Sequence, residues 1–288
     1  MKAYEYILIK QIQWALNRSI NLIGSRGKRG RPAYTPELDQ NLFEPLDPVI
    51  KKNFESGDGG EINGSPNRPA KIQAVHSSSA LGVNIFQYWQ KIGQIPKIAA
   101  SCGFCRRGNK ISEKIVFEDK YPIDKRFRYH PNIDVVIYNS DSAKYKRFAI
   151  ECKFSEAYTS QRNHGLKEKY LDLEGIWNDI PNLHYLSGDL SPDDNIFKYL
   201  HPAQLIKHIL GLKKAFGKTG FRLLYLWYDV WGEEGSIHKK EIDRFIKVAR
   251  SDDVKIHVLS YQDLIARLSA ECRSDHEKYV KYITGRYL

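Results

Sequence analysis

The chain of 288 residues is long enough for one large domain or two small ones. Its hydrophobic content of 42%, with 5 Trp, 18 Tyr and 12 Phe, excludes a disordered protein, and its net charge of +11 favours a polyanionic partner, nucleic acid first. No apolar run approaches the roughly 18 residues of a membrane span, and no signal-peptide core begins the chain. We therefore expect a cytoplasmic protein with no membrane partner.

The first half of the chain is expected to place helices and loops before a set of strands. Residues 1–24 are predicted to be helical, and loops rich in turn-forming residues follow at 25–34 and 56–69. Any of Ser77, Ser78 and Ser79 can cap a helix over 80–93. In this helix, Leu81, Ile85, Trp89 and Ile92 keep helical spacing. Three strand candidates come next, over 114–123, 132–138 and 146–154.

The second half begins with residues 155–200, which are rich in Asn, Asp, Gly and Pro and are predicted to form an irregular insertion. A helix is expected over 201–216, followed by an almost wholly apolar strand over 221–230 that is typical of burial on both faces. A helix, a strand and a helix are expected over 238–250, 254–260 and 261–272.

The core elements follow the order helix, three strands, helix, strand (αβββαβ), so we expect a mixed α/β fold with additions at both ends. In this interpretation residues 1–76 form an N-terminal helical and loop extension that packs on a domain formed by residues 77–288.

The stretch FAIECKF at 148–154 carries charged residues within an apolar strand. Because side chains alternate along a strand, Glu151 and Lys153 share one face with Ala149. The other face then holds Phe148, Ile150, Cys152 and Phe154. A half-exposed strand with its charged side in water is the simplest interpretation.

The preceding strand candidate, NIDVVIY at 132–138, suggests another interpretation. If Tyr138 pairs with Arg147 in an antiparallel hairpin, Asp134 lies opposite Glu151, and the apolar residues Ile133, Val135 and Ile137 share a face with Phe148 and Ile150. Directly opposed carboxylates repel each other unless a cation lies between them. Two carboxylates suit Mg²⁺, and Lys153 on the same face could then contact a phosphate oxygen or an attacking water. The pattern thus favours metal-assisted phosphodiester hydrolysis.

Asp134 followed by Glu151-Cys152-Lys153 resembles the motif of the PD-(D/E)XK nuclease superfamily, which has a restriction-endonuclease-like fold. The resemblance covers roughly residues 77–230, and the stretches HSSSALGVNIFQYW and HPAQLIKHILGL are similar to a group of bacterial restriction-endonuclease-like proteins. One departure is Pro131, which stands three residues before Asp134 rather than next to it. The resemblance implies a nuclease with the αβββαβ core named above.

The resemblance also implies roles for individual residues. Asp134 and Glu151 would hold Mg²⁺, with Mn²⁺ as an alternative, and the backbone carbonyl of Cys152 could join them. Lys153 would assist the nucleophilic water or stabilise charge on phosphorus. Gln204, on the helix over 201–216, would position Lys153 or a phosphate oxygen. A third carboxylate is expected from Glu118 or, as second choice, Glu61; an ordinary surface acid is the alternative for each.

Basic residues outside the motif are candidates for binding phosphates. Lys207 shares a helical stripe with Gln204, and Arg29 and Arg31 lie in the basic loop at 25–34. A solvated basic surface is the alternative for all three. His208, on the same stripe, is a weaker candidate for a general base.

Cys102 and Cys105 form a CxxC pair that could hold zinc or remain reduced thiols. The other two cysteines lack CxxC spacing.

The sequence therefore predicts a Mg²⁺-dependent deoxyribonuclease that acts on DNA, with a two-fold homodimer as the expected assembly for cutting a duplex. One alternative is a nucleic-acid-binding protein that keeps the fold without cleaving. Another is a metabolic α/β enzyme in which Asp134, Glu151 and Lys153 form a surface ion-pair group.

Overall fold

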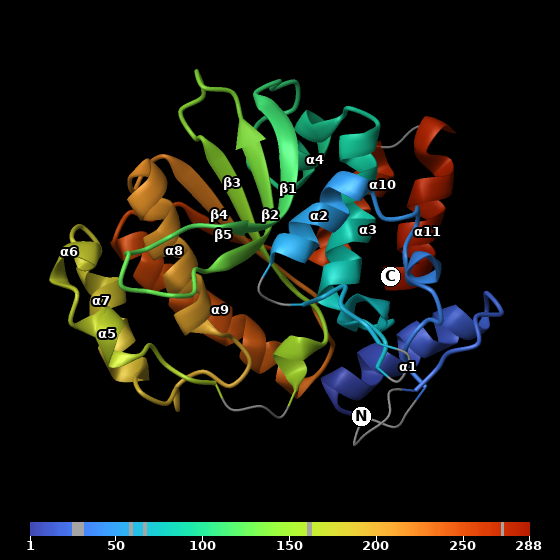
Figure 1. Ribbon diagram of the computed structural model, residues 1–288, viewed down its shortest axis with the longest axis horizontal. Coiled ribbons are helices and arrows are strands. Elements are labelled where there is room, and N and C mark those ends of the chain that lie inside the picture. Colours follow the sequence, from blue (N-terminus) through green and yellow to red (C-terminus); the bar gives the residue numbers. More distant parts are fainter. Residues whose placement is uncertain (25–31, 58–59, 66–67, 160–162, 272–273) are drawn as a thin grey trace.

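A mixed five-stranded sheet lies between two layers of helices in the computed structural model, which describes residues 1–24, 32–57, 60–65, 68–159, 163–271 and 274–288 (Figure 1). The strands neighbour one another in chain order: β1 (Ser112–Lys120), β2 (Asn132–Asn139), β3 (Arg147–Lys153), β4 (Phe221–Trp227) and β5 (Ile256–Ser260). β1, β2 and β3 form an antiparallel meander, whereas β3, β4 and β5 run parallel to one another. The chain is an α/β protein, as the sequence predicts.

Helices from both ends of the chain lie on one side of the sheet, and the first and last of them pack outside the helices that contact the strands (Figure 1). The helices on this side are α1 (Ala3–Leu16), α2 (Pro48–Ser56), α3 (Ser78–Lys91), α4 (Ile95–Ser101), α10 (Tyr261–Glu271) and α11 (Glu277–Tyr287). Their apolar side chains meet those of Phe148 and Ile150 in what we call the first core. Short 3₁₀ turns occur at Leu38–Asn41, Lys71–Gln73, Glu156–Tyr158 and Ser274–His276.

The helices that connect β3 to β4 and β4 to β5 lie on the opposite side of the sheet, where the two longest pack on the strands and the shorter ones lie outside them (Figure 1). The helices on this side are α5 (Glu168–Leu171), α6 (Glu174–Trp177), α7 (Pro181–Leu190), α8 (Pro202–Phe216) and α9 (Glu233–Ser251). Their apolar side chains meet those of Ala149 and Val136 in the second core. A parallel pair of strands needs such a crossover, which explains the long connection between β3 and β4.

β4 confirms the prediction of a strand buried on both faces. Leu224 and Leu226 belong to the first core, whereas Leu223 and Tyr225 belong to the second. Because each face of β4 packs against a different layer of helices, neither face needs polar side chains. Burial of each large apolar side chain here contributes roughly 1.5–3 kcal/mol.

The hairpin of β2 and β3 has the predicted register. Tyr138 pairs with Arg147 and Val135 pairs with Ile150, so that paired residue numbers sum to 285. The ladder ends at Val135–Ile150, one position before Asp134 would face Glu151. The two strands therefore separate at the level of these two acidic residues.

The prediction that Ile133 shares a face with Val135 is wrong, because Ile133 lies in the second core and Val135 in the first. Glu118 on β1 explains the change. It lies between the pairs Phe117–Val135 and Asp119–Ile133 and has a φ of 52°. This left-handed backbone interrupts the alternation of side chains. The interruption occurs where β1 and β2 carry Glu118 and Asp134.

Residues 155–200 are more ordered than the sequence predicts, because they hold α5, α6 and α7. α7 begins with Pro181 at its first position, where proline is favoured. Leu183, Leu186 and Leu190 recur with helical spacing and are buried in the second core. Tertiary burial of this leucine stripe outweighs the many polar and turn-forming residues around it.

The N-terminal helix is shorter than the predicted 1–24, since it ends at Leu16, and Ser19 takes a φ of 56°. α2, α4 and α11 were not expected from the sequence. α2 has recognisable signals, because Asp47 accepts a hydrogen bond from the Val49 N–H at 2.8 Å and Pro48 occupies the first position. Its short length of 9 residues hides these signals among the neighbouring loops.

Candidate active site

Glu151 lies on β3 with its side chain fully buried between two nitrogen groups. Lys153 Nζ lies 2.7 Å from one carboxylate oxygen, and His208 Nε2, from α8, lies 2.8 Å from the other. Burial alone would raise the pKa of Glu151, but the charges of Lys153 and His208 outweigh it and hold the pKa at about 2. Glu151 is therefore ionised at neutral pH.

Lys153 is held from two sides. Besides its contact with Glu151, Nζ donates a hydrogen bond to Gln204 Oε1 at 2.9 Å. Gln204 reaches this position from the first turn of α8, which begins at Pro202. Burial would lower the pKa of Lys153, but the negative charges of Glu151, Glu156 and Asp134 raise it above its usual value. The side chain is thus a fixed ammonium group.

Asp134 reaches β3 through its side chain. Its Oδ2 accepts a hydrogen bond from the Cys152 N–H at 2.7 Å, beyond the end of the β2–β3 ladder. Burial and then the charge of Glu151 raise the pKa of Asp134 well above its usual value. The hydrogen bond to the Cys152 N–H places this carboxylate next to β3, one residue from Glu151, although the ladder of the two strands has ended here.

Glu118 adds a third carboxylate to the same region. Burial, followed by the charge of Glu61, raises the pKa of Glu118 to about 7, and Glu151 contributes in the same direction. Its Oε2 accepts a hydrogen bond from Asn132 Nδ2 at 3.3 Å. Glu61 forms an ion pair with Lys71 at 3.2 Å. Both candidates for the third carboxylate therefore lie near each other, and Glu118 lacks a cationic partner at ion-pair distance among the described residues.

Cys152 turns its sulfur away from these acids. The side chain belongs to the first core, where Sγ would lie 3.8 Å from a Cβ built on Gly82. Burial raises the pKa of the thiol well above its usual value. The sulfur is therefore unsuited to bind a metal, and only the backbone of Cys152 can take part in the site.

Of the three predicted phosphate-binding residues, Lys207 is the one that the structure describes. Lys207 lies on α8 with Nζ 5.8 Å from the centre of the Tyr170 ring, and burial followed by the charges of Lys167 and Lys169 lowers its pKa. It thus faces the segment before α7. Arg29 and Arg31 lie outside the described residues.

A family model described as "Restriction Endonuclease associating with ARP" matches residues 11–288. The chain belongs to this family. The match confirms the likeness to restriction endonucleases over nearly the whole chain, whereas membership of the wider PD-(D/E)XK superfamily stays a prediction. No curated protein and no solved structure matches the chain. Over the part of the chain that the structure describes, no helix is long and apolar enough to cross a membrane.

In this restriction-endonuclease family member, three residues near Lys153 have roles that the sequence did not reveal. Both carboxylate oxygens of Glu156 lie 3.3 Å from the Phe154 N–H, and burial raises the pKa of Glu156. Burial and then the charge of Lys153 lower the pKa of His201 to about 4. The sequence makes His208 a candidate general base, but in the structure its Nε2 contacts Glu151 Oε2. His208 follows from helical spacing, since it shares a stripe of α8 with Gln204, whereas the positions of Glu156 and His201 near Lys153 do not follow from residue spacing.

Cys102 and Cys105 are free thiols. Burial raises the pKa of each one. Within the described residues, no group of three or more His, Cys, Asp or Glu side chains is arranged to hold a metal ion, so no zinc site forms around the pair there. Reduced thiols are the interpretation that agrees with this environment.

Proposed function

We propose that the chain is a metal-dependent nuclease that hydrolyses phosphodiester bonds of DNA. The family description names a restriction endonuclease, a class of enzyme that acts on DNA. The observation that carries the proposal is the position of Lys153, whose ammonium group is fixed between Glu151 and Gln204 beside the carboxylate of Asp134. A fixed cation next to several acids is suited to a phosphate group that a metal ion accompanies.

The acids match Mg²⁺ in their chemistry, although no three of the described side chains form a ready-made metal cluster. Mg²⁺ prefers a few carboxylate ligands and keeps several waters. The raised pKa values of Asp134 and Glu118 reflect buried negative charge that a divalent cation would neutralise. We propose Asp134, Glu151, Glu118 and the backbone carbonyl of Cys152 as ligands for Mg²⁺, with Mn²⁺ as an alternative.

When bound, the cation would supply a water of lowered pKa and would neutralise charge on the leaving oxygen. Lys153 does not act as a general base, because its raised pKa keeps the side chain protonated at neutral pH. Its ammonium group is suited to bind a nonbridging phosphate oxygen, where negative charge grows in the transition state. Gln204 holds the ammonium in place by accepting its hydrogen bond.

His208 holds the second carboxylate oxygen of Glu151. By contacting Glu151 Oε2, it leaves Oε1 directed at Lys153 and fixes the plane of the carboxylate. We propose that His208 is a positioning residue. Lys207 Nζ lies 5.8 Å from the centre of the Tyr170 ring, and we propose that it binds the DNA backbone at some distance from the cleaved bond.

The proposal is tested by incubating the full chain with supercoiled plasmid and Mg²⁺ or Mn²⁺. We expect the supercoiled form to be lost, and EDTA to prevent this loss. A matched incubation with single-stranded DNA and with RNA separates the substrates. If the plasmid is bound but stays supercoiled with both cations, the chain is a non-cleaving nucleic-acid-binding protein instead.

Cleavage of both strands of a duplex is most simply achieved by a two-fold dimer with one site for each strand. We propose such a homodimer. It predicts that linear plasmid forms together with nicked plasmid, and that light scattering gives twice the mass of one chain, 33.4 kDa.

A further inference from the structure

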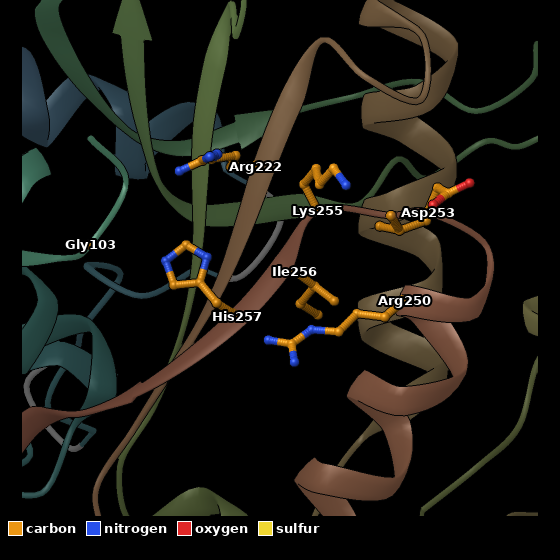
Figure 2. Close-up of a pocket in the computed structure, with 8 residues that line it drawn as sticks. Gly103, Arg222, Arg250, Asp253, Lys255, Ile256 and His257 are labelled. Carbon is orange, nitrogen blue, oxygen red and sulfur yellow. The ribbon is translucent and has the colours of Figure 1, made fainter. Parts of the chain in front are cut away.

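A groove of about 520 Å³ lies at the start of β4 and β5, where β5 forms an edge of the sheet (Figure 2). Arg222 comes from β4, Arg250 from the end of α9, and Lys255 and His257 from the start of β5. Gly103, Asp253, Val254 and Ile256 complete the lining.

This groove is separate from the candidate active site. In the parallel register of β3 and β4, Arg222 pairs with Phe148, whereas Lys153 pairs with Trp227, five residues further along each strand. At about 3.3 Å per residue, the two places are roughly 17 Å apart along the sheet. A ligand in the groove therefore need not touch Lys153 or the acids around it.

The groove carries excess positive charge. Arg222, Arg250 and Lys255 are cationic, and Asp253 is the acid among the lining residues. Within the described part of the chain, neither Arg250 nor Lys255 has a hydrogen-bonded or ion-paired side-chain partner. Burial and the nearby arginines lower the pKa of His257 to about 4, so its ring is neutral. Three cations thus face one acid, with two of the cations available to a ligand.

Arg222 is already held in place for binding. One of its terminal nitrogens donates to the Phe104 carbonyl oxygen at 2.6 Å, and its guanidinium lies 4.5 Å from the centre of the Tyr145 ring. A guanidinium carries five N–H groups, so several donors remain after this single hydrogen bond. A positioned arginine loses less conformational entropy on binding an anion than a free one.

We propose that this groove binds a phosphate-bearing ligand of nucleotide size. Arginine pairs present forked donors that match phosphate oxygens, and Lys255 adds a further charge. The volume lies within the range of small-ligand pockets, and Val254 and Ile256 give the groove apolar lining beside the cations. The same phosphate chemistry could come from a free nucleotide or from one nucleotide unit of a nucleic-acid strand that passes the sheet edge.

The test compares two double variants of the full chain in EDTA, which prevents metal-dependent cleavage. Arg250→Ala with Lys255→Ala removes two exposed cations from the groove. Lys240→Ala with Lys247→Ala removes the same charge from exposed positions on α9 outside the groove. Equal thermal melting curves for the two variants establish that both are folded.

Binding is measured at fixed salt by titration calorimetry with ATP and, separately, with a short single-stranded oligonucleotide. We expect the Kd of at least one probe to rise tenfold or more in the groove variant and to change less than twofold in the control. A rise for ATP identifies a free nucleotide as a ligand. A rise for the oligonucleotide alone identifies a strand.

The proposal is overturned if both double variants bind the two probes with equal affinity, or if the unmodified chain binds neither probe saturably. Because EDTA is present throughout, these results do not depend on whether the chain cleaves DNA. Failure of the plasmid assay would therefore leave the groove proposal standing, and the reverse also holds.

Discussion

Lys153 Nζ lies 2.7 Å from Glu151 Oε1, and the two residues stand two positions apart on β3. In a strand, residues two positions apart share a face, so the backbone itself brings the ammonium to the carboxylate. Lys153 is only 9% exposed and Glu151 is fully buried. In a buried pair of this kind, each charged group depends on the other, because a buried charge without its partner is unfavourable.

Lys153→Ala should lower the rate of plasmid cleavage at least a hundredfold while DNA affinity changes little. The lysine acts where charge grows on phosphorus, so its loss falls on turnover. Affinity depends on many dispersed phosphate contacts, of which one lysine supplies about one. Cleavage is measured in Mg²⁺ and binding in Ca²⁺ at the same salt concentration.

Lys114→Ala is the matched control, because Lys114 is an exposed lysine on β1. It should cleave and bind as the unmodified chain does. If Lys153→Ala loses binding as completely as cleavage, Lys153 serves to hold Glu151 rather than to act in the chemical step.

His208→Ala should destabilise the fold, because it leaves a fully buried carboxylate oxygen of Glu151 without its nitrogen partner. Removal of a partner from a buried charge costs about 2–4 kcal/mol of unfolding free energy. Urea denaturation at pH 7 measures the change. His164→Ala, at an exposed ion pair with Asp193, should stay within about 0.5 kcal/mol. Equal effects of the two substitutions would mean that His208 does not support Glu151.

His238 should make stability depend on pH. Its Nε2 lies 3.0 Å from Tyr225 Oη and its Nδ1 lies 3.2 Å from Tyr158 Oη, and burial lowers its pKa to about 3. The unfolded chain takes up a proton on this ring below about pH 6.5, whereas the folded chain does not. Stability is therefore lost as the pH falls from about 6.5 toward 3, by about 2 kcal/mol at pH 5 from this group.

His238→Gln removes that proton uptake and keeps a side chain able to form hydrogen bonds. Between pH 7 and pH 5 its unfolding free energy should fall by about 2 kcal/mol less than that of the unmodified chain. Urea denaturation at several pH values gives both slopes. Parallel slopes for the two proteins would refute a buried neutral His238.

Period-two patterns predicted the parts of the site that depend on strand geometry alone. The register that pairs Tyr138 with Arg147 follows from matching apolar faces, and the structure confirms it. The shared face of Glu151 and Lys153 follows from the same rule. The apolar stretch of β4 likewise predicted burial on both sides.

Features that depend on unusual backbone or on loop paths could not be predicted. Glu118 takes a φ of 52°. A glycine or asparagine in the sequence would have indicated this left-handed backbone, whereas a glutamate does not. That single residue changes the face of Ile133. Glu156, whose charge helps to raise the pKa of Lys153, lies in a 3₁₀ turn that residue spacing does not place near this lysine. Lys207 shares a helical stripe with Gln204, yet its long side chain extends toward Tyr170.

Arg286 joins the two ends of the chain. Its guanidinium lies 3.8 Å from the centre of the Trp14 ring, donates to Gln11 Oε1 at 2.9 Å, and donates to the carbonyl oxygens of Asn41 and Val75. It is 1% exposed and has no carboxylate partner within the described residues. The buried positive charge of Arg286 is thus stabilised by hydrogen bonds to uncharged oxygen atoms of residues 11–75.

Arg286→Met should lower the free energy of unfolding by about 3 kcal/mol or more, because several buried acceptors lose their donor at once. Arg18→Met is the control, since Arg18 lies 5.7 Å from the centre of the same Trp14 ring but is exposed. It should change stability by less than about 1 kcal/mol. Urea unfolding followed by tryptophan fluorescence and by circular dichroism measures both variants.

If residues 1–76 pack on the remainder as predicted, the two signals should change in one transition for the unmodified chain. A separate early transition, or an Arg286→Met variant as stable as the control, would contradict this role for Arg286.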